Sequence, residues 1–106
     1  MRGLSVVALA VAGAISSTAN AAGDPDQGAL LADTCMGCHG IPGYNNVYPT
    51  YRVPKLGGQN AAYLAASLKA YRSGDRAHPT MRAQAKLMTD QDIADLAAFF
   101  SQAPKR

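Results

Sequence analysis

The apolar residues in the C-terminal half of the chain recur at the three- and four-residue intervals of amphipathic helices. Leu64, Leu68 and Tyr71 lie on one such stripe. Asn60 before them can cap a helix N-terminus, and Gly74 after them can end the helix. A second stripe near the C-terminus consists of Ile93, Leu96, Ala97 and Phe100. We therefore expect two helices that each bury one face.

Capping residues mark the ends of the later helices. Thr89 and Asp92 form an acidic variant of the capping box ahead of the last apolar stripe, and Pro104 follows its end. A shorter helical turn is expected upstream, with Thr80 as its cap and Lys86 at its end.

A further helix is expected to begin at Asp24 and Pro25, an N-cap aspartate followed by a proline at the first helical position. It should run toward Cys35, with Leu30 facing inward. Gly28 would allow another helix to approach closely, because it carries no side chain.

Residues 40–59 are rich in Gly, Pro, Asn and Tyr and show neither the helical nor the strand period, so we expect a loop that wraps around the domain. There is no internal repeat. With about four helices and almost no alternating β-branched stretch, the sequence predicts one small all-α domain.

Residues 1–21 have the pattern of a secretory signal peptide. Arg2 gives a charged start, residues 4–15 are apolar, and residues 19–21 (Ala-Asn-Ala) form a small-residue cleavage site. A membrane anchor is the weaker alternative, because the apolar run is short for a bilayer span. Cleavage would leave residues 22–106, which is 106 − 21 = 85 residues, as one domain exported to the periplasm.

The most specific motif in the chain is Cys35-Met36-Gly37-Cys38-His39. Two thiols separated by two residues can add to the two vinyl groups of a porphyrin. A histidine directly after the second thiol is carried beneath the ring, where its imidazole can bind the iron. Cys35 and Cys38 are therefore the expected thioether anchors of one covalent haem c, and His39 is the expected proximal ligand.

Three other kinds of site are built from the same residue types and are alternatives to haem attachment. A thioredoxin-like dithiol belongs to a βαβ pattern, which is lacking here. A zinc site needs four ligands, and the available Cys and His residues are Cys35, Cys38, His39 and His78, two of them adjacent. A disulfide would leave His39 without a role. Haem attachment uses the whole motif, and a buried haem would also support a small core that has no Trp and two Phe.

Further motifs follow the haem-attachment run in a fixed order: Pro54-Lys55-Leu56-Gly57-Gly58-Gln59, Tyr63-Leu64, Gly74-Asp75-Arg76, Met81 and Asp90-Gln91-Asp92-Ile93-Ala94-Asp95-Leu96-Ala97. With these motifs in this order, the chain resembles the class I cytochromes c. It is most similar to the short bacterial single-haem group, whose domains also occur in pairs in periplasmic di-haem cytochromes. The resemblance covers essentially all of residues 22–106 and implies a small fold of about four helices wrapped around one haem. The segment of residues 44–53 is longer and contains more Tyr than the corresponding segment of the simplest members of this group.

The resemblance implies a methionine as the sixth ligand to the haem iron. Met81 stands at the matching position before the final helix, with Met88 and His78 as alternatives. His/Met ligation raises the reduction potential relative to two histidines and leaves no open site on the iron, which favours one-electron transfer over catalysis. Pro54 matches the family proline whose carbonyl accepts the other ring N–H of the proximal histidine, with simple loop rigidity as its alternative role.

Positive charge is concentrated in the middle of the chain. Residues 40–88 contain seven basic side chains against one acidic side chain, Asp75. The resemblance places much of this section around the haem edge, so we expect a basic rim that steers an acidic redox partner. Tyr48, Tyr51 and Arg52 are candidates for contacts to the haem propionates. Scattered charge and export both argue against binding of nucleic acid.

Three functions fit these residues. The leading one is a diffusible periplasmic electron carrier that exists as a monomer or weak dimer and does not insert into the membrane after signal cleavage. The second is the cytochrome subunit of a larger periplasmic oxidoreductase, for example one that contains a flavoprotein. The third is a small peroxidase whose methionine ligand leaves the iron.

Overall fold

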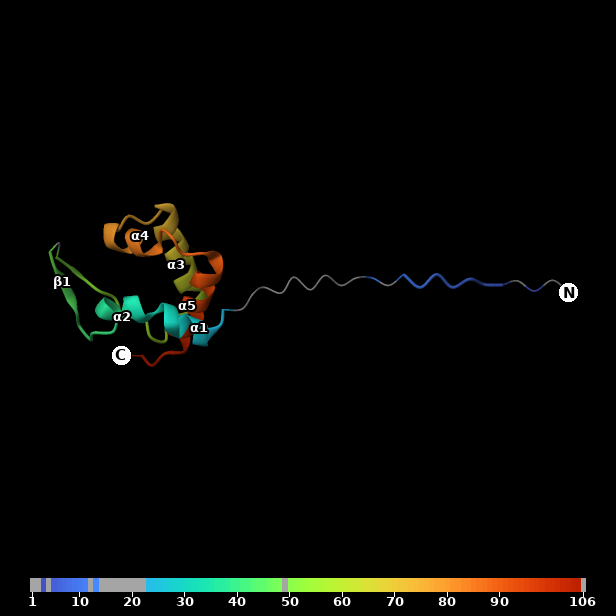
Figure 1. The fold of residues 1–106 in the computed structure, drawn as a ribbon, viewed down its shortest axis with the longest axis horizontal. Coiled ribbons are helices and arrows are strands. Elements are labelled where there is room, and N and C mark those ends of the chain that lie inside the picture. Colours follow the sequence, from blue (N-terminus) through green and yellow to red (C-terminus); the bar gives the residue numbers. More distant parts are fainter. Residues whose placement is uncertain (1–2, 4, 12, 14–22, 49, 106) are drawn as a thin grey trace.

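The computed structural model describes residues 3, 5–11, 13, 23–48 and 50–105. Arg2 and the predicted cleavage site at residues 19–21 lie outside the described residues. Residues 5–11 are exposed, form no helix or strand, and lie away from the helical body (Figure 1). None of the helices in the described part of the chain is long and apolar enough to cross a membrane.

Most of the described chain is helical, and the only strands in it form one short hairpin. The helices are α1 (Pro25–Leu31), α2 (Asp33–His39), α3 (Ala61–Ser73), α4 (Pro79–Ala85) and α5 (Asp90–Gln102). The antiparallel hairpin consists of β1 (Asn45–Val47) and β2 (Thr50–Arg52). The all-α class predicted from the sequence is confirmed.

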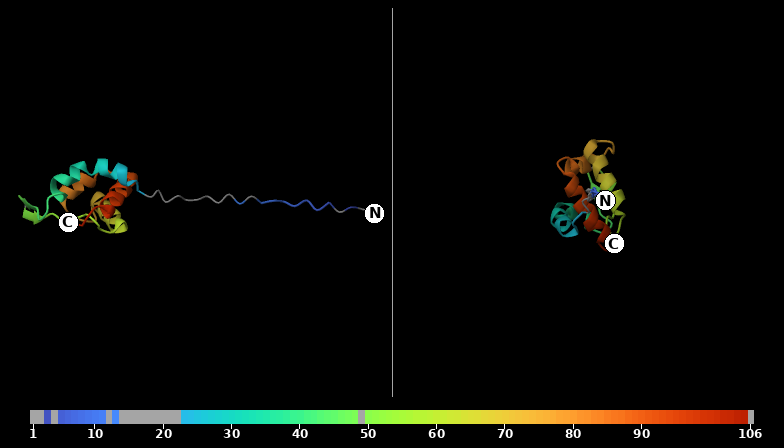
Figure 2. Two further views of the ribbon diagram at one scale, coloured as in Figure 1. Left: turned by 90° about the horizontal axis from the view of Figure 1, so that it is seen from below. Right: turned by 90° about the vertical axis from the view of Figure 1, so that its right-hand side faces the viewer.

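Helix α5 lies between α1 and α3 and packs against both (Figure 2). Gly28 is buried where α1 crosses α5, and a Cβ atom at this position would collide with the backbone carbonyl of Asp95. The close approach expected at Gly28 is therefore present. The Asp95 carboxylate is also buried, and it accepts hydrogen bonds from the backbone N–H of Asp24 and from Gln91 Nε2, each at 2.8 Å. The bond from Asp24 joins the start of α1 to the middle of α5, and the bond from Gln91 lies within α5.

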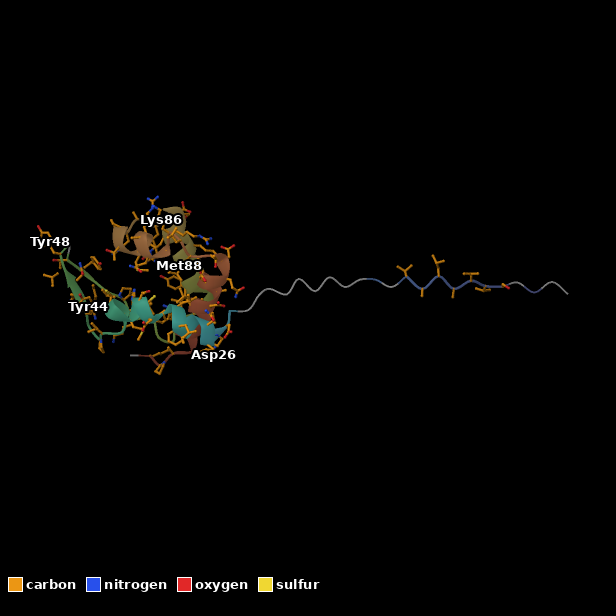
Figure 3. The ribbon with its side chains drawn as sticks, in the orientation of Figure 1. Asp26, Tyr44, Tyr48, Lys86 and Met88 are labelled. Atoms are coloured by element: carbon orange, nitrogen blue, oxygen red, sulfur yellow. The ribbon has the colours of Figure 1, made fainter. Side chains whose placement is uncertain are left out.

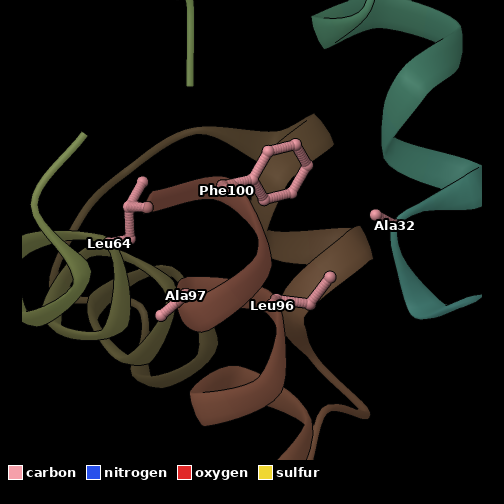
Figure 4. Close-up of a cluster of buried hydrophobic side chains, with 5 residues drawn as sticks. All are labelled: Ala32, Leu64, Leu96, Ala97 and Phe100. Atoms are coloured by element: carbon pink, nitrogen blue, oxygen red, sulfur yellow. The ribbon is translucent and has the colours of Figure 1, made fainter. Parts of the chain in front are cut away.

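The buried core connects these helices. Figure 4 shows its five central side chains, which come from the end of α1, from α3 and from α5: Ala32, Leu64, Leu96, Ala97 and Phe100. Both apolar stripes predicted from the sequence contribute to this core. Ile93, on the second stripe, is fully buried.

The predicted helix caps are largely confirmed. Asn60 accepts a hydrogen bond from the backbone N–H of Tyr63, and Gly74 ends α3 in the left-handed conformation with φ of +89°. Thr89 and Asp92 form both hydrogen bonds of a capping box. Each cap satisfies backbone groups that a helix end leaves without an intrahelical partner.

Four expectations differ from the structure in detail. The single first helix is divided at Ala32 into α1 and α2, so the described chain has five helices instead of about four. Leu30 is 73% exposed, because α1 turns other residues toward α5. Helix α4 is capped by His78 rather than Thr80 and has Pro79 in its first turn. Finally, the expected loop over residues 40–59 contains the β1–β2 hairpin.

Candidate cofactor site

A cavity of about 450 Å³ lies in the helical body and is lined by residues from α2, β2, α3, α4 and α5. Pockets that hold cofactors or other ligands typically have volumes of ~300–1,000 Å³. One wall is formed by core side chains, among them Leu64, Leu96 and Phe100. The cavity therefore continues the hydrophobic core, and a flat apolar molecule inside it would complete the packing of the helices.

Helix α2 carries the haem-attachment motif to this cavity. Cys35 and Cys38 are three residues apart on the helix, which puts them on the same face, and both line the cavity. No disulfide joins the two sulfurs, and burial raises the pKa of Cys35 as a thiol. Met36, between them, is 45% exposed and does not line the cavity. The helix thus directs both sulfurs to one side, as two thioether bonds to one porphyrin require.

His39 ends α2 and also lines the cavity. Its Nδ1 lies 2.8 Å from the backbone carbonyl oxygen of Pro54, so Nδ1 donates its proton to this carbonyl. The other ring nitrogen, Nε2, then has its lone pair available for a metal. The contact expected between the Pro54 carbonyl and the ring of His39 is thus present in the geometry.

The three candidates for the second axial ligand all line the cavity. Met88 packs against the hydrophobic core, and Figure 3 shows it within the helical body. His78 caps α4, where its Nδ1 accepts a hydrogen bond from the backbone N–H of Met81 at 3.4 Å. Met81 is half-buried and is not part of the core cluster. Of the three, Met81 is thus the side chain that has neither a packing role nor a capping role.

The cavity lining also carries positive charge. Arg52, Lys55 and Arg76 belong to the described lining residues, which include no carboxylate. Arg76 lies over the ring of Tyr71, with its guanidinium carbon 4.8 Å from the ring centroid. A cationic lining matches the two negative propionates of a haem. Of the candidate propionate contacts, Tyr51 and Arg52 line the cavity, whereas Tyr48 is 96% exposed at the outer end of the hairpin (Figure 3).

One group of contacts was not anticipated from the sequence. The Tyr51 hydroxyl on β2 donates a hydrogen bond to Thr80 Oγ1 on α4 at 3.1 Å. The Tyr51 ring also packs edge-on against His78, with ring centroids 4.6 Å apart. These contacts join the hairpin to α4. No local pattern predicts these contacts, because Tyr51 and Thr80 are 29 residues apart and lie in segments that were predicted separately.

The residues around the cavity fit a covalently bound haem. The two thiols, the oriented imidazole, the thioether side chains, the apolar wall and the cationic lining are the groups that such a haem would need. The fit rests on the identity and placement of side chains from five separate elements.

Comparison with known proteins agrees with this fit. The family model for cytochrome c matches residues 25–104. Cytochrome c-554(548) of Halomonas halodenitrificans is 43% identical over 83 residues, which cover 76% of this chain and 96% of the relative. The reduced recombinant cytochrome c4 from Pseudomonas stutzeri superposes with a TM-score of 0.60 at 31% identity, over 76% of this chain and 48% of that chain.

The thiosulfate dehydrogenase of Marichromatium purpuratum superposes with a TM-score of 0.62 at 30% identity, over 76% of this chain and 19% of that chain. The chain thus spans nearly the whole of one relative, about half of the cytochrome c4 and a small part of the dehydrogenase. This chain belongs to the cytochrome c family. It is an electron-transfer protein that binds one covalent haem c.

Proposed function

We propose that the protein is a periplasmic one-electron carrier whose haem is attached through Cys35 and Cys38 and ligated by His39 and Met81. The observation that carries this proposal is the convergence of these four side chains on one cavity, with His39 Nδ1 held by the Pro54 carbonyl at 2.8 Å. The bound haem iron supplies the ferric and ferrous states between which a single electron is exchanged.

The proximal side is organised by α2 and by the residues that follow β2. The hydrogen bond to Pro54 fixes the orientation of the His39 ring and makes its Nε2 a stronger donor to the metal. The adjacent Val53 is buried and its N–H donates to the carbonyl of Tyr44, which holds this part of the backbone in place. The proximal ligand would therefore move little when the iron changes its oxidation state.

On the distal side, Met81 would supply a neutral thioether. Such a ligand favours ferrous iron and raises the reduction potential relative to a second histidine. With both axial positions filled, the iron would have no site for a substrate, which supports electron transfer rather than peroxidase chemistry.

Export and docking complete the proposal. Residues 1–21 would be removed as a signal peptide, so that the domain works in the periplasm. The cations Arg52, Lys55 and Arg76 lie beside the cavity, and we propose that they form the basic rim that attracts an acidic redox partner.

Optical spectra of the ferric protein test the ligand set. Met81→Ala should abolish the charge-transfer band that a methionine ligand gives with ferric iron, whereas the matched Met88→Ala variant should keep the band and lose stability. Because Met88 is partly buried against the core, its truncation should cost about 2 kcal/mol of unfolding free energy, at the lower end of the range for core side chains. Survival of the band in Met81→Ala would overturn the ligand assignment.

A second function is supported by one of the comparisons. The similarity to part of a thiosulfate dehydrogenase favours a role as the cytochrome component of a larger oxidoreductase. Stable co-purification of the protein with a dehydrogenase from periplasmic extracts would support this role. Elution of the protein alone, together with rapid reduction by added partners, would support the free carrier.

A further inference from the structure

The hairpin and α4 are two elements that are too small to be stable alone. The hairpin has three residue pairs, and Val47 and Tyr48 at its outer end are 80% and 96% exposed. Helix α4 has seven residues. Isolated two-stranded hairpins and helices of this length are marginal at best in water. Their conformation therefore depends on contacts with other parts of the protein.

Three side chains join these two elements at the edge of the cavity. Tyr51, at the centre of β2, donates to Thr80 Oγ1 and packs its ring against His78 with an interplanar angle of 83°. In turn, Nδ1 of His78 accepts a hydrogen bond from the backbone N–H of Met81. Behind His78 lies Tyr71 on α3, with ring centroids 6.2 Å apart.

The contacts of Tyr51 and His78 therefore lead directly to the proposed distal ligand. Met81 follows Thr80 in the chain, and its own N–H is the group that His78 caps. One route by which Met81 would leave the iron is a shift of the first turn of α4. That shift would break the Tyr51–Thr80 hydrogen bond, the Tyr51–His78 ring contact and the helix cap.

We propose that Tyr51, His78 and Thr80 form a latch between β2 and α4 that keeps Met81 on the haem iron. The three are positioning residues, since they act through Met81. This inference rests on the proposed function, in which Met81 is the distal ligand. It also assigns a role to one tyrosine of residues 44–53, the segment in which the chain departs from the simplest members of its family.

The latch is tested by the rate at which cyanide binds to the ferric protein, because cyanide must replace the distal methionine. Tyr51→Phe keeps the ring and removes the hydroxyl, so cyanide binding should become about threefold to tenfold faster. His78→Ala removes the cap and the ring contact together, and the rate should rise about tenfold to a hundredfold. His78→Asn restores a capping oxygen and should recover part of the effect.

Two matched variants separate the latch from general stability. Tyr48→Phe makes the same chemical change as Tyr51→Phe at an exposed position of the same hairpin. Thr89→Ala removes the cap of α5 and should lower overall stability as much as the loss of the α4 cap does. Both variants should bind cyanide at the rate of the unaltered protein.

The outcomes distinguish the two proposals. Equal cyanide-binding rates in Tyr51→Phe and Tyr48→Phe, or equal acceleration in Thr89→Ala and His78→Ala, would overturn the latch. Loss of the methionine band in Met81→Ala with unchanged rates in the latch variants would overturn the latch alone. Survival of that band in Met81→Ala would overturn the ligand assignment itself.

Discussion

Replacing Gly28 with alanine tests how the attachment helix is held in position. Gly28 is buried at the crossing of α1 and α5, and α1 leads directly into α2, which carries Cys35 and Cys38. A Cβ atom at residue 28 would collide with the carbonyl of Asp95 and would lie 2.8 Å from Cβ of Phe99. Backbone carbonyl atoms cannot rotate away, so the two helices would have to separate.

The size of the effect follows from two opposing contributions. Overpacking a close contact costs about 1–3 kcal/mol. Alanine gains about 1 kcal/mol over glycine inside a helix, which offsets part of this cost. We expect a net loss of up to about 2 kcal/mol, which for a domain of this size lowers the melting temperature by up to roughly 15 °C.

Thermal unfolding of the haem-loaded protein, followed by circular dichroism, is the appropriate assay. Gly37→Ala is the matched control, because an added Cβ at this exposed helical position meets no atom within 4 Å. The control should keep or raise the melting temperature. If Gly28→Ala is as stable as Gly37→Ala, the close packing of α1 on α5 is wrong.

Three further predictions concern charge and the core. Arg72, whose Nη2 lies 2.7 Å from Asp90 Oδ1, lowers the pKa of that exposed carboxyl below its ordinary 3.8. The Arg72–Asp90 ion pair therefore stabilises the fold at pH values above 3.8, and this stabilisation is lost as the pH falls through the lowered pKa of Asp90. Urea unfolding should show a small deficit for Asp90→Asn at neutral pH that disappears in acid, and a deficit that persists in acid would contradict this account. Phe100→Ala removes a ring shared by the core and the cavity wall, and should lower the free energy of unfolding measured in urea by about 3–5 kcal/mol. A much smaller loss would show that the wall does not depend on this ring. Lys55→Glu should slow reduction by an acidic partner and weaken its dependence on ionic strength, and an unchanged salt dependence would remove Lys55 from the rim.

Local signals predicted the parts of the fold that are local in origin. The caps at Asn60, Gly74 and Thr89 use contacts within a few residues, so their spacing in the sequence was sufficient. The core stripe of α5 was evident because its apolar residues recur with the helical period. Gly28 was informative for a different reason, since a glycine within a helix is unfavourable unless a neighbour approaches closely.

The features that the sequence did not reveal depend on contacts between distant segments. The hairpin has no strand period because only three pairs form, and it is joined to α4 through Tyr51. His78 is an unusual helix cap, so Thr80 was the more typical choice nearby. Leu30 was expected inside because it is apolar, but the way α1 packs on α5 leaves it exposed.

The placement of the cofactor site was predicted unevenly. Cys35, Cys38 and His39 were evident from one short motif, and the structure puts all of them on one cavity. The choice of distal ligand could not be made from residue type, because Met81, Met88 and His78 line the same cavity. The resemblance favoured Met81 by its position before the final helix, and the separate packing and capping roles of Met88 and His78 add a second distinction.

The central claim is that one haem is joined to the exported chain through Cys35 and Cys38. The intact mass of the protein purified from the periplasm tests it most directly. We expect the mass of residues 22–106 plus one haem, with the haem retained under denaturing conditions and lost when both cysteines are replaced by alanine. A purified protein with only the mass of the bare chain would contradict the account.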